Sequence, residues 1–135
     1  MRVFLDTNVL VSTFASRGLC AEVLELVLLE HDLVVGRNVL RELRKALRDK
    51  IKLPSVRSAE ILDFVSTEAT QVVDKSEAAI VNADADDALV IGEALASHAH
   101  IFVTGDAALL RLAAVGELRI VSPRRSWEIL RAGND

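Results

Sequence analysis

Short apolar runs alternate with longer segments of mixed polarity along this chain of 135 residues. The short runs are hydrophobic nearly throughout, which is typical of strands buried on both faces of a sheet. They predict five strands, at residues 3–5, 33–35, 71–73, 101–103 and 119–121. The longer segments repeat apolar residues every three to four positions, which predicts helices at 8–16, 20–30, 37–49, 56–67, 87–98 and 107–115. A last helix is predicted at about 123–132, with Ser122 as its N-cap and Pro123 at its first position.

This alternation of strands and helices indicates the fold class. It predicts an α/β protein in which a parallel sheet of about five strands lies between two layers of helices. The length suits a single domain spanning 1–135, with a hydrophobic content of 51% supplying its core. In such sheets, sites form beyond the carboxyl ends of the strands, so the residues that follow each strand are the first candidates for chemistry.

Two acidic residues occupy such positions. Asp6 directly follows the strand at 3–5, and Asp106 follows the strand at 101–103, with Thr104 between them. Because the carboxyl ends of parallel strands meet at one edge of the sheet, we expect both carboxylates to lie at that edge.

Further acids stand on two predicted helices. Asp84, Asp86 and Asp87 cluster at the start of the helix at 87–98. Glu42 interrupts a basic helix, about 100° from the centre of its apolar face by helical-wheel spacing. Glu42 therefore lies at the rim of that helix, from which its carboxylate could reach the sheet edge.

Each acid also has an ordinary structural explanation. Asp6, Asp87 and Asp106 could be helix N-caps, each worth about 1 kcal/mol. Glu42 could pair with Lys45 on a solvated helix face. Taken together, however, several neighbouring carboxylates raise one another's pKa unless a cation compensates. A cluster of oxygen donors suits a hard divalent ion, Mg²⁺ or Mn²⁺, and the three histidines show no ligand spacing.

These residues also carry a resemblance to a known family. The segments VFLDTNVLVS, DADDALVIGEAL and FVTGDAALL, with Glu42 between the first two, resemble the PIN domain family in order and approximate spacing. The resemblance runs from residue 2 to about 123 and is strongest to the PIN-family toxins (VapC-like ribonucleases) of toxin–antitoxin modules.

The resemblance implies roles for individual residues. The acids that it assigns to a catalytic, metal-holding quartet are Asp6, Glu42, Asp87 and Asp106. Asn8 and Thr104 match polar positions that support the quartet, while Asp84 and Asp86 remain alternatives for its third member.

The function implied by the resemblance is hydrolysis of RNA phosphodiester bonds by a Mg²⁺- or Mn²⁺-dependent ribonuclease, the toxin of a type II toxin–antitoxin system. The implied partners are an RNA substrate, a cognate antitoxin and a second copy of the chain in a homodimer. Two alternatives stay open: a cellular RNA-processing PIN nuclease, and a catalytically inactive PIN-like binding or scaffold domain.

The distribution of charge adds a candidate RNA-binding surface. The net charge of −4 argues against a protein that binds nucleic acid through net charge alone. The segment RNVLRELRKALRDKIK at 37–52 nevertheless concentrates basic residues around Glu42. The side chains there that we expect to contact RNA phosphates are Arg41, Arg44, Lys45 and Arg48.

Two other classes of α/β protein with acidic Mg²⁺ sites fit less well. Haloacid-dehalogenase-like phosphatases need a second Asp two positions after the first, where this chain has Asn8. A phospho-acceptor receiver domain needs a Lys after its fifth strand, and none follows residue 121.

Cysteine content and hydropathy bear on the compartment. The single cysteine, Cys20, rules out an internal disulfide and fits a reducing environment. No apolar run approaches the roughly 20 residues needed to span a bilayer. We therefore expect a cytoplasmic protein with no membrane association.

Overall fold

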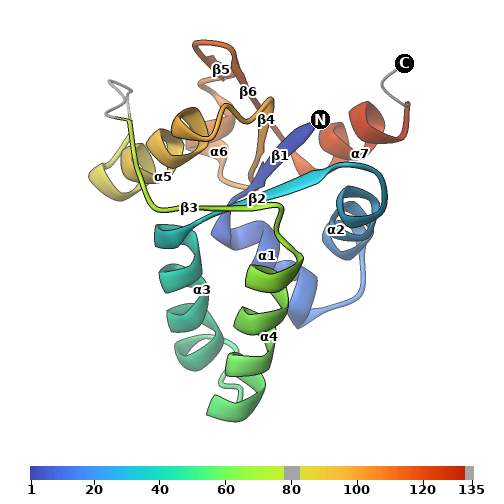
Figure 1. The fold of residues 1–135 in the computed structure, drawn as a ribbon, viewed down its shortest axis with the longest axis vertical. Coiled ribbons are helices and arrows are strands. Elements are labelled where there is room, and N and C mark those ends of the chain that lie inside the picture. Colours follow the sequence, from blue (N-terminus) through green and yellow to red (C-terminus); the bar gives the residue numbers. More distant parts are fainter. Residues whose placement is uncertain (78–82, 133–135) are drawn as a thin grey trace.

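The computed structural model describes residues 1–77 and 83–132 and shows a six-stranded sheet covered by helices (Figure 1). The strands are β1 (Arg2–Leu5), β2 (Asp32–Gly36), β3 (Gln71–Val73), β4 (Ile101–Val103), β5 (Ala114–Val115) and β6 (Leu118–Val121). Their order across the sheet is β3-β2-β1-β4-β6-β5, and every neighbouring pair is parallel except β5 with β6. The predicted α/β fold with a central, mostly parallel sheet is therefore confirmed.

Seven helices lie within the described residues. They are α1 (Thr7–Ala15), α2 (Leu19–Glu30), α3 (Arg37–Asp49), α4 (Ser55–Glu68), α5 (Ala85–Ala96), α6 (Ala107–Leu110) and α7 (Pro123–Arg131). Figure 1 shows α5 and α6 on one side of the strands and α2 and α7 on the other, with α1, α3 and α4 grouped together. None of these helices combines the length and apolar character that crossing a bilayer requires.

The central strands are buried on both faces, as their apolar composition predicts. Val3, Phe4 and Leu5 of β1 have no exposed surface, and Phe102 on the neighbouring β4 is equally buried. Phe4 and Phe102 pair in register, and their rings stack with centroids 5.3 Å apart. Burying large side chains contributes about 25 cal/mol for each Å² of apolar surface removed from water, so β1 and β4 form the centre of the hydrophobic core.

One predicted helix is wrong. The segment at 107–115 was expected to be helical throughout, but α6 ends at Leu110 and the chain then forms β5. Ala113 and Gly116 have positive φ angles of 64° and 60°, which interrupt helical geometry. Val115 then pairs with Leu118 across a two-residue loop, so a hairpin replaces the end of the helix.

The topology creates a crevice between β1 and β4. These neighbouring strands are parallel, but β1 continues into α1 while β4 continues into α6, and Figure 1 shows these helices leaving in different directions. A crevice outside the carboxyl ends of such diverging strands is where α/β sheets bind ligands. The candidate site lies there.

Candidate functional site

Asp6 lies where β1 becomes α1, and its carboxylate is held by three hydrogen bonds. The Thr7 backbone N–H donates to Oδ1 at 2.8 Å. Asn8 Nδ2 and the Thr104 hydroxyl donate to Oδ2 at 3.1 and 2.8 Å. The Asp6 backbone N–H also donates to the Val103 carbonyl at 2.9 Å, which fastens this residue to the end of β4. Asp6 is the N-cap of α1 through its bond to the Thr7 N–H. Its second carboxylate oxygen accepts two further bonds, which a cap does not need.

Thr104 and Asn8 join the ends of the two strands. The Thr104 side chain is completely buried, and its oxygen accepts from the Asp106 backbone N–H at 3.0 Å while its hydroxyl donates to Asp6. Asn8 Oδ1 accepts from the Gly105 backbone N–H at 2.8 Å. Both side chains are neutral, so they orient the Asp6 carboxylate without adding negative charge.

The pKa of Asp6 is raised by burial and by a nearby charge, and it is lowered by these hydrogen bonds. Desolvation raises the pKa of Asp6, and the nearby negative charge of Glu42 raises it further. The hydrogen bonds from Thr104, Thr7 and Asn8 lower it, but the net shift is upward. The site thus holds a carboxylate whose ionised form is costly in the absence of a compensating charge.

Glu42 reaches the same place from the side of α3. Its side chain is half-buried, and Oε1 accepts a 2.6 Å hydrogen bond from the Thr7 hydroxyl. Among the described residues the ion pairs are Arg48–Asp49, Arg57–Glu60 and Arg125–Glu128. The ordinary explanation of Glu42 as the ion-pair partner of Lys45 therefore does not hold.

The three acids near the start of α5 separate into different positions. The predicted start at residue 87, with Asp87 as a possible N-cap, is wrong, because α5 starts at Ala85 and Asp84 is its N-cap. Asp84 Oδ1 accepts from the Asp87 backbone N–H at 2.8 Å, as a capping carboxylate does at the third helical position. Asp87 is consequently inside the first turn, where its own carboxylate is free to face the crevice.

Asp106 completes the group from the β4 side. It is the N-cap of α6, and its Oδ1 accepts from the Leu109 backbone N–H at 3.0 Å. The prediction of an N-cap is confirmed here, yet the residue also lines the crevice. Capping and a place at the site are therefore compatible for Asp6 and Asp106.

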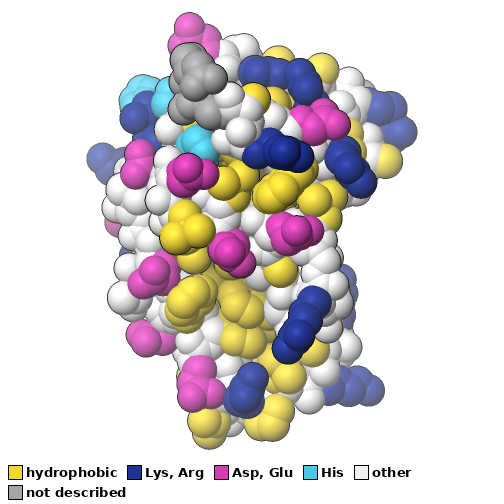
Figure 2. All heavy atoms as spheres, turned by 90° about the vertical axis from the view of Figure 1, so that its right-hand side faces the viewer, with side chains coloured by type: hydrophobic (Ala, Val, Ile, Leu, Met, Phe, Trp, Pro, Cys, Tyr) yellow, Lys and Arg dark blue, Asp and Glu magenta, His cyan; other side chains and the backbone are white. Residues whose placement is uncertain are grey.

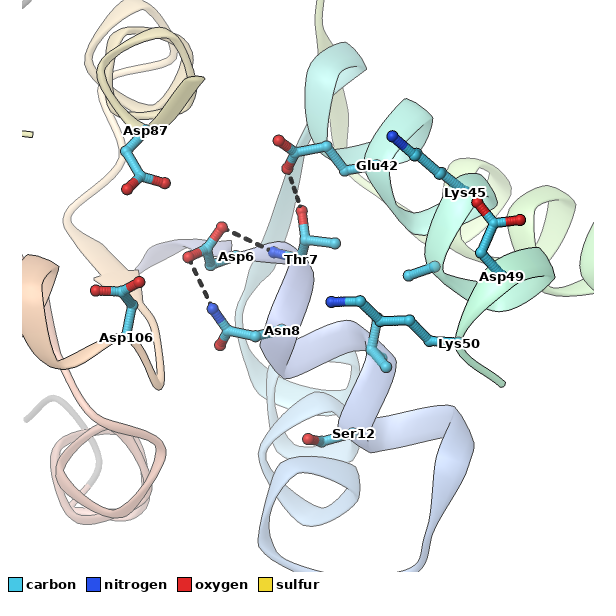
Figure 3. A pocket seen from close by; sticks show the side chains of 12 residues that line it. Asp6, Thr7, Asn8, Ser12, Glu42, Lys45, Asp49, Lys50, Asp87 and Asp106 are labelled. Carbon is cyan, nitrogen blue, oxygen red and sulfur yellow. Dashed lines mark hydrogen bonds between the residues drawn. The ribbon is translucent and has the colours of Figure 1, made fainter. Parts of the chain in front are cut away.

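One cavity of about 570 Å³ brings most of the predicted residues together (Figure 3). Its polar lining consists of Asp6, Thr7, Asn8, Ser12, Glu42, Lys45, Asp49, Lys50, Asp87 and Asp106. Thr104 lies buried behind Asp6, and Asp84 and Asp86 are exposed outside this cavity. Among the three candidates for the third acid, Asp87 is the one that faces Asp6, Glu42 and Asp106.

The carboxylates repel one another across the cavity. The pKa of Asp87 rises to about 6, first through burial and then through the negative charges of Asp84, Asp6, Asp106 and Glu42. Such a rise is what a cluster of like charges produces, and a divalent cation would reverse it.

The donor set fits a hard cation in its chemistry but is not preassembled. All candidate ligands around the cavity are oxygen atoms, which suits Mg²⁺ or Mn²⁺. In the part of the chain that the structure describes, no three acidic, histidine or cysteine side chains already form a coordination group. Holding an ion here requires side chains such as Glu42 and Asp87 to turn inward toward Asp6.

A second, basic cavity of about 370 Å³ lies on the other side of Glu42. Its lining residues are Asn38, Arg41, Glu42, Arg44, Lys45, Arg48, Asp86 and Leu89. All four basic side chains predicted to contact RNA are therefore on one surface, next to the acidic cavity.

Sequence reasoning missed four polar residues of the acidic cavity, which are Thr7, Ser12, Asp49 and Lys50. Thr7 holds Glu42, and the triplet Asp6-Thr7-Asn8 could have indicated it as the middle of a polar stretch. Lys50 lies just past the end of α3, where helical periodicity no longer applies, and Figure 3 shows its amine pointing toward Thr7 and Asn8.

Comparisons with known proteins identify the family and the fold. The family model described as PIN domain matches residues 2–108. No curated protein matches the chain. A solved structure of VapBC2 from Rickettsia felis, bound to a DNA fragment from its promoter, superposes with a TM-score of 0.67 at 18% sequence identity. That match covers 90% of this chain and 98% of the other, and at this identity it shows a shared fold.

Proposed function

This chain belongs to the PIN domain family, and from that premise we propose that it is a divalent-metal-dependent ribonuclease that hydrolyses phosphodiester bonds. PIN domains are generally nucleases, and they generally use divalent metal ions. The observation that carries the proposal is the convergence of Asp6, Glu42, Asp87 and Asp106 on one cavity from four different elements.

In this proposal the acids bind the metal, and neutral residues beside them keep the acids in position. Asp6, Asp87, Asp106 and Glu42 hold Mg²⁺ or Mn²⁺. When bound, the cation supplies stabilisation of the negative charge that builds up on the phosphodiester and lowers the pKa of attacking water. Asn8 and Thr104 keep the Asp6 carboxylate in one orientation, and Thr7 does the same for Glu42.

The basic surface of α3 supports an RNA substrate. Arg41, Arg44, Lys45 and Arg48 neutralise phosphates next to the cleavage site, and Lys50 adds a positive charge inside the acidic cavity. None of these side chains reads a base in this proposal, so they position RNA without selecting its sequence.

We also propose that the protein is the toxin of a type II toxin–antitoxin system, with a cognate antitoxin and a homodimeric state. The fold shared with VapBC2 of Rickettsia felis supports this. Figure 2 shows hydrophobic side chains gathered on the face that includes α2 and α7. Leu29 of α2 is 75% exposed and Phe64 of α4 is 43% exposed, which suits surfaces that a partner covers.

The test of the nuclease is a cleavage assay on labelled single-stranded and hairpin RNAs, with matched DNA strands, in Mn²⁺, Mg²⁺ or EDTA. We expect cutting of RNA that requires the metal and disappears in Asp6→Asn. Asp63→Asn is the matched control, because Asp63 is an exposed aspartate on α4 outside both cavities.

The outcomes separate the alternatives. Metal-independent cutting, or equal activity in Asp6→Asn and the wild type, contradicts the proposal. Absence of both cutting and calorimetric Mn²⁺ binding supports a binding or scaffold domain instead. Growth arrest on expression that Asp6→Asn abolishes, and that a protein encoded next to this gene relieves, supports the toxin. Activity without growth arrest supports an RNA-processing enzyme.

A further inference from the structure

The third acidic residue of α5, Glu93, is buried and hydrogen-bonded to α3. Only 1% of its surface is exposed. Its Oε2 accepts two hydrogen bonds of 3.0 Å, one from the backbone N–H of Asn38 and one from the Asn38 side-chain amide. Asn38 is the second residue of α3, whose N-cap, Gly36, has no side chain to satisfy that N–H. Glu93 therefore does from α5 what a capping side chain usually does from the same helix.

The backbone beside Glu93 is shaped to admit the carboxylate. A Cβ at Gly36 would lie 2.1 Å from Glu93 Oε1, so any larger residue there would displace the carboxylate from this position. Gly36 has an ordinary extended backbone with φ −92°, so the approach of Glu93, and not the backbone conformation, favours glycine there. The end of β2, the start of α3 and the middle of α5 thus meet at one carboxylate.

Keeping this carboxylate in the core is costly. Burial raises the pKa of Glu93, although the two bonds from Asn38 oppose the rise. Its Oε1 has no hydrogen-bond partner among the described residues. Such an unsatisfied buried atom lowers the stability of the fold, and an apolar side chain would fill the same position without that cost. The cost indicates a role other than packing.

The contact between Glu93 and Asn38, called the joint below, connects the two helices that carry Glu42 and Asp87. Asn38 precedes Glu42 by four residues on α3, a rise of about 6 Å, and Glu93 follows Asp87 by six residues on α5, about 9 Å. The two bonds at Glu93 are the hydrogen bonds that connect α3 with α5 within the described residues. The spacing between Glu42 and Asp87 therefore depends on this joint.

We propose that Glu93 is a positioning residue, which sets the distance between Glu42 and Asp87 by fixing the start of α3 to α5. This inference rests on the proposed metal site. It adds to that site a residue that contacts neither metal nor RNA and acts through the geometry of two helices. The network extends outward through Asn38, whose Oδ1 accepts a hydrogen bond from Arg41 on the basic surface.

The test compares three substitutions in α5. Glu93→Leu removes the joint, and Glu93→Gln keeps an oxygen acceptor for Asn38. Ile91→Val is the matched control, since Ile91 is fully buried in the same helix but makes no contribution to the joint. The readouts are calorimetric Mn²⁺ affinity, amide hydrogen exchange at Asn38 and thermal stability.

We expect Glu93→Leu to weaken Mn²⁺ binding about tenfold, in the range of losses for residues that orient ligands. Exchange of the Asn38 N–H should accelerate in the same variant. Glu93→Gln should stay within about threefold of the wild type, and Ile91→Val should lower stability with unchanged Mn²⁺ affinity. If Glu93→Leu does not fold, Asn38→Ala breaks one of the two bonds and should weaken Mn²⁺ binding about threefold.

Glu42→Gln distinguishes failure of this inference from failure of the metal site. Loss of Mn²⁺ affinity in Glu42→Gln, together with unchanged affinity in Glu93→Leu and Asn38→Ala, overturns the positioning role alone. Absence of Mn²⁺ binding in the wild type, or an unchanged affinity in Glu42→Gln, overturns both proposals.

Discussion

The candidate site has two halves that are built differently. At the sheet edge, Asp6 is nearly buried, accepts three hydrogen bonds and continues the backbone ladder of the central strands. On the helices, Glu42 accepts a single side-chain bond from Thr7. The Asp87 carboxylate accepts none from the described residues, and its pKa is raised to about 6 by burial and by the negative charges around it.

The difference shows how a site can be both ordered and adjustable. The sheet half is part of the core, so it cannot move unless the most stable strands open. On the helices, the Glu42 and Asp87 side chains can turn at the cost of a few polar contacts, while α3 and α5 themselves stay joined at Glu93. A cation would therefore find one fixed carboxylate and draw the others toward it.

The largest expected effect tests whether both halves bind the metal. Asp87→Asn should weaken Mn²⁺ binding by about 100-fold or more, at least as much as the loss of an orienting residue, even though no described residue donates a hydrogen bond to the Asp87 carboxylate. Asp86→Asn should change the affinity about threefold or less, because Asp86 faces the basic cavity. Calorimetry measures the Mn²⁺ affinity of both variants. A larger loss in Asp86→Asn than in Asp87→Asn would mean that Asp86 is the third acidic ligand.

The next prediction compares the loss in free energy of unfolding when Thr104 or Thr7 is replaced by valine. Thr104→Val should lower the free energy of unfolding by about 2 kcal/mol, because it leaves Asp6 Oδ2 and the Asp106 N–H with fewer partners in the core. Thr7→Val, which removes only the half-buried bond to Glu42, should cost less than about 1 kcal/mol. Urea denaturation without metal provides both values. Equal losses would mean that the two halves are equally rigid.

A smaller effect is expected in the pH dependence of the metal-free protein. The folded-state pKa of Asp87, about 6, exceeds the ordinary value of 3.8. Its contribution to stability is therefore complete below about pH 4 and lost as pH rises through 6. The loss is on the order of 1 kcal/mol once solvent screening of this partly exposed group is allowed for.

Thermal unfolding between pH 4 and 8 measures this loss. Asp87→Asn should reduce the dependence of stability on pH but not abolish it. Asp6 also has a raised pKa, so its ionisation still lowers stability as the pH rises. Saturating Mn²⁺ should flatten it in the wild type above pH 6. A wild-type profile that rises from pH 4 to 7 would contradict the repulsion on which the site is argued.

The smallest effect concerns the outer face of α3. In an inactive Asp6→Asn background, replacing Arg44 and Arg48 with Gln should reduce the slope of log K against log salt for single-stranded RNA by about 1.4. Arg57→Gln on α4 should leave the slope unchanged, since Arg57 lies outside both cavities. Fluorescence anisotropy at several salt concentrations measures the slope. An equal reduction by Arg57→Gln would indicate diffuse attraction instead of a defined surface.

Local patterns in the sequence were sufficient for most of the fold. The strands at 71–73 and 101–103 have the predicted bounds. For 101–103 the reason is a run of three apolar residues that are all buried, whereas at 71–73 only Val73 is buried. Ser122 and Pro123 begin α7 as predicted, with Ser122 accepting from the Arg125 N–H at 3.1 Å. The hairpin of β5 was not predictable in this way, since its apolar residues are compatible with a helix until Gly116 turns the chain.

Position next to a strand end predicted part of the site, while Glu42 and Asp87 were assigned through the resemblance to PIN domains. Asp6 and Asp106 follow from their position after β1 and β4, and their convergence follows from a parallel sheet. The choice between Asp87 and Asp84 depended on which of the two carboxylates caps α5. The sequence did not fix the start of that helix to within one turn. Glu93 could not be found at all, because a buried glutamate in an apolar helical segment acquires meaning only when Gly36 and Asn38 are seen beside it.

The two ends of the sheet have a consequence for how copies of this protein meet. The edge strands β3 and β5 are three and two residues long, and β5 runs against its neighbour. Short or reversed edges offer few backbone groups to an incoming strand, which protects against sheet extension and aggregation. The proposed homodimer would therefore form through the helical faces, where Leu29 of α2 and Phe64 of α4 expose apolar side chains.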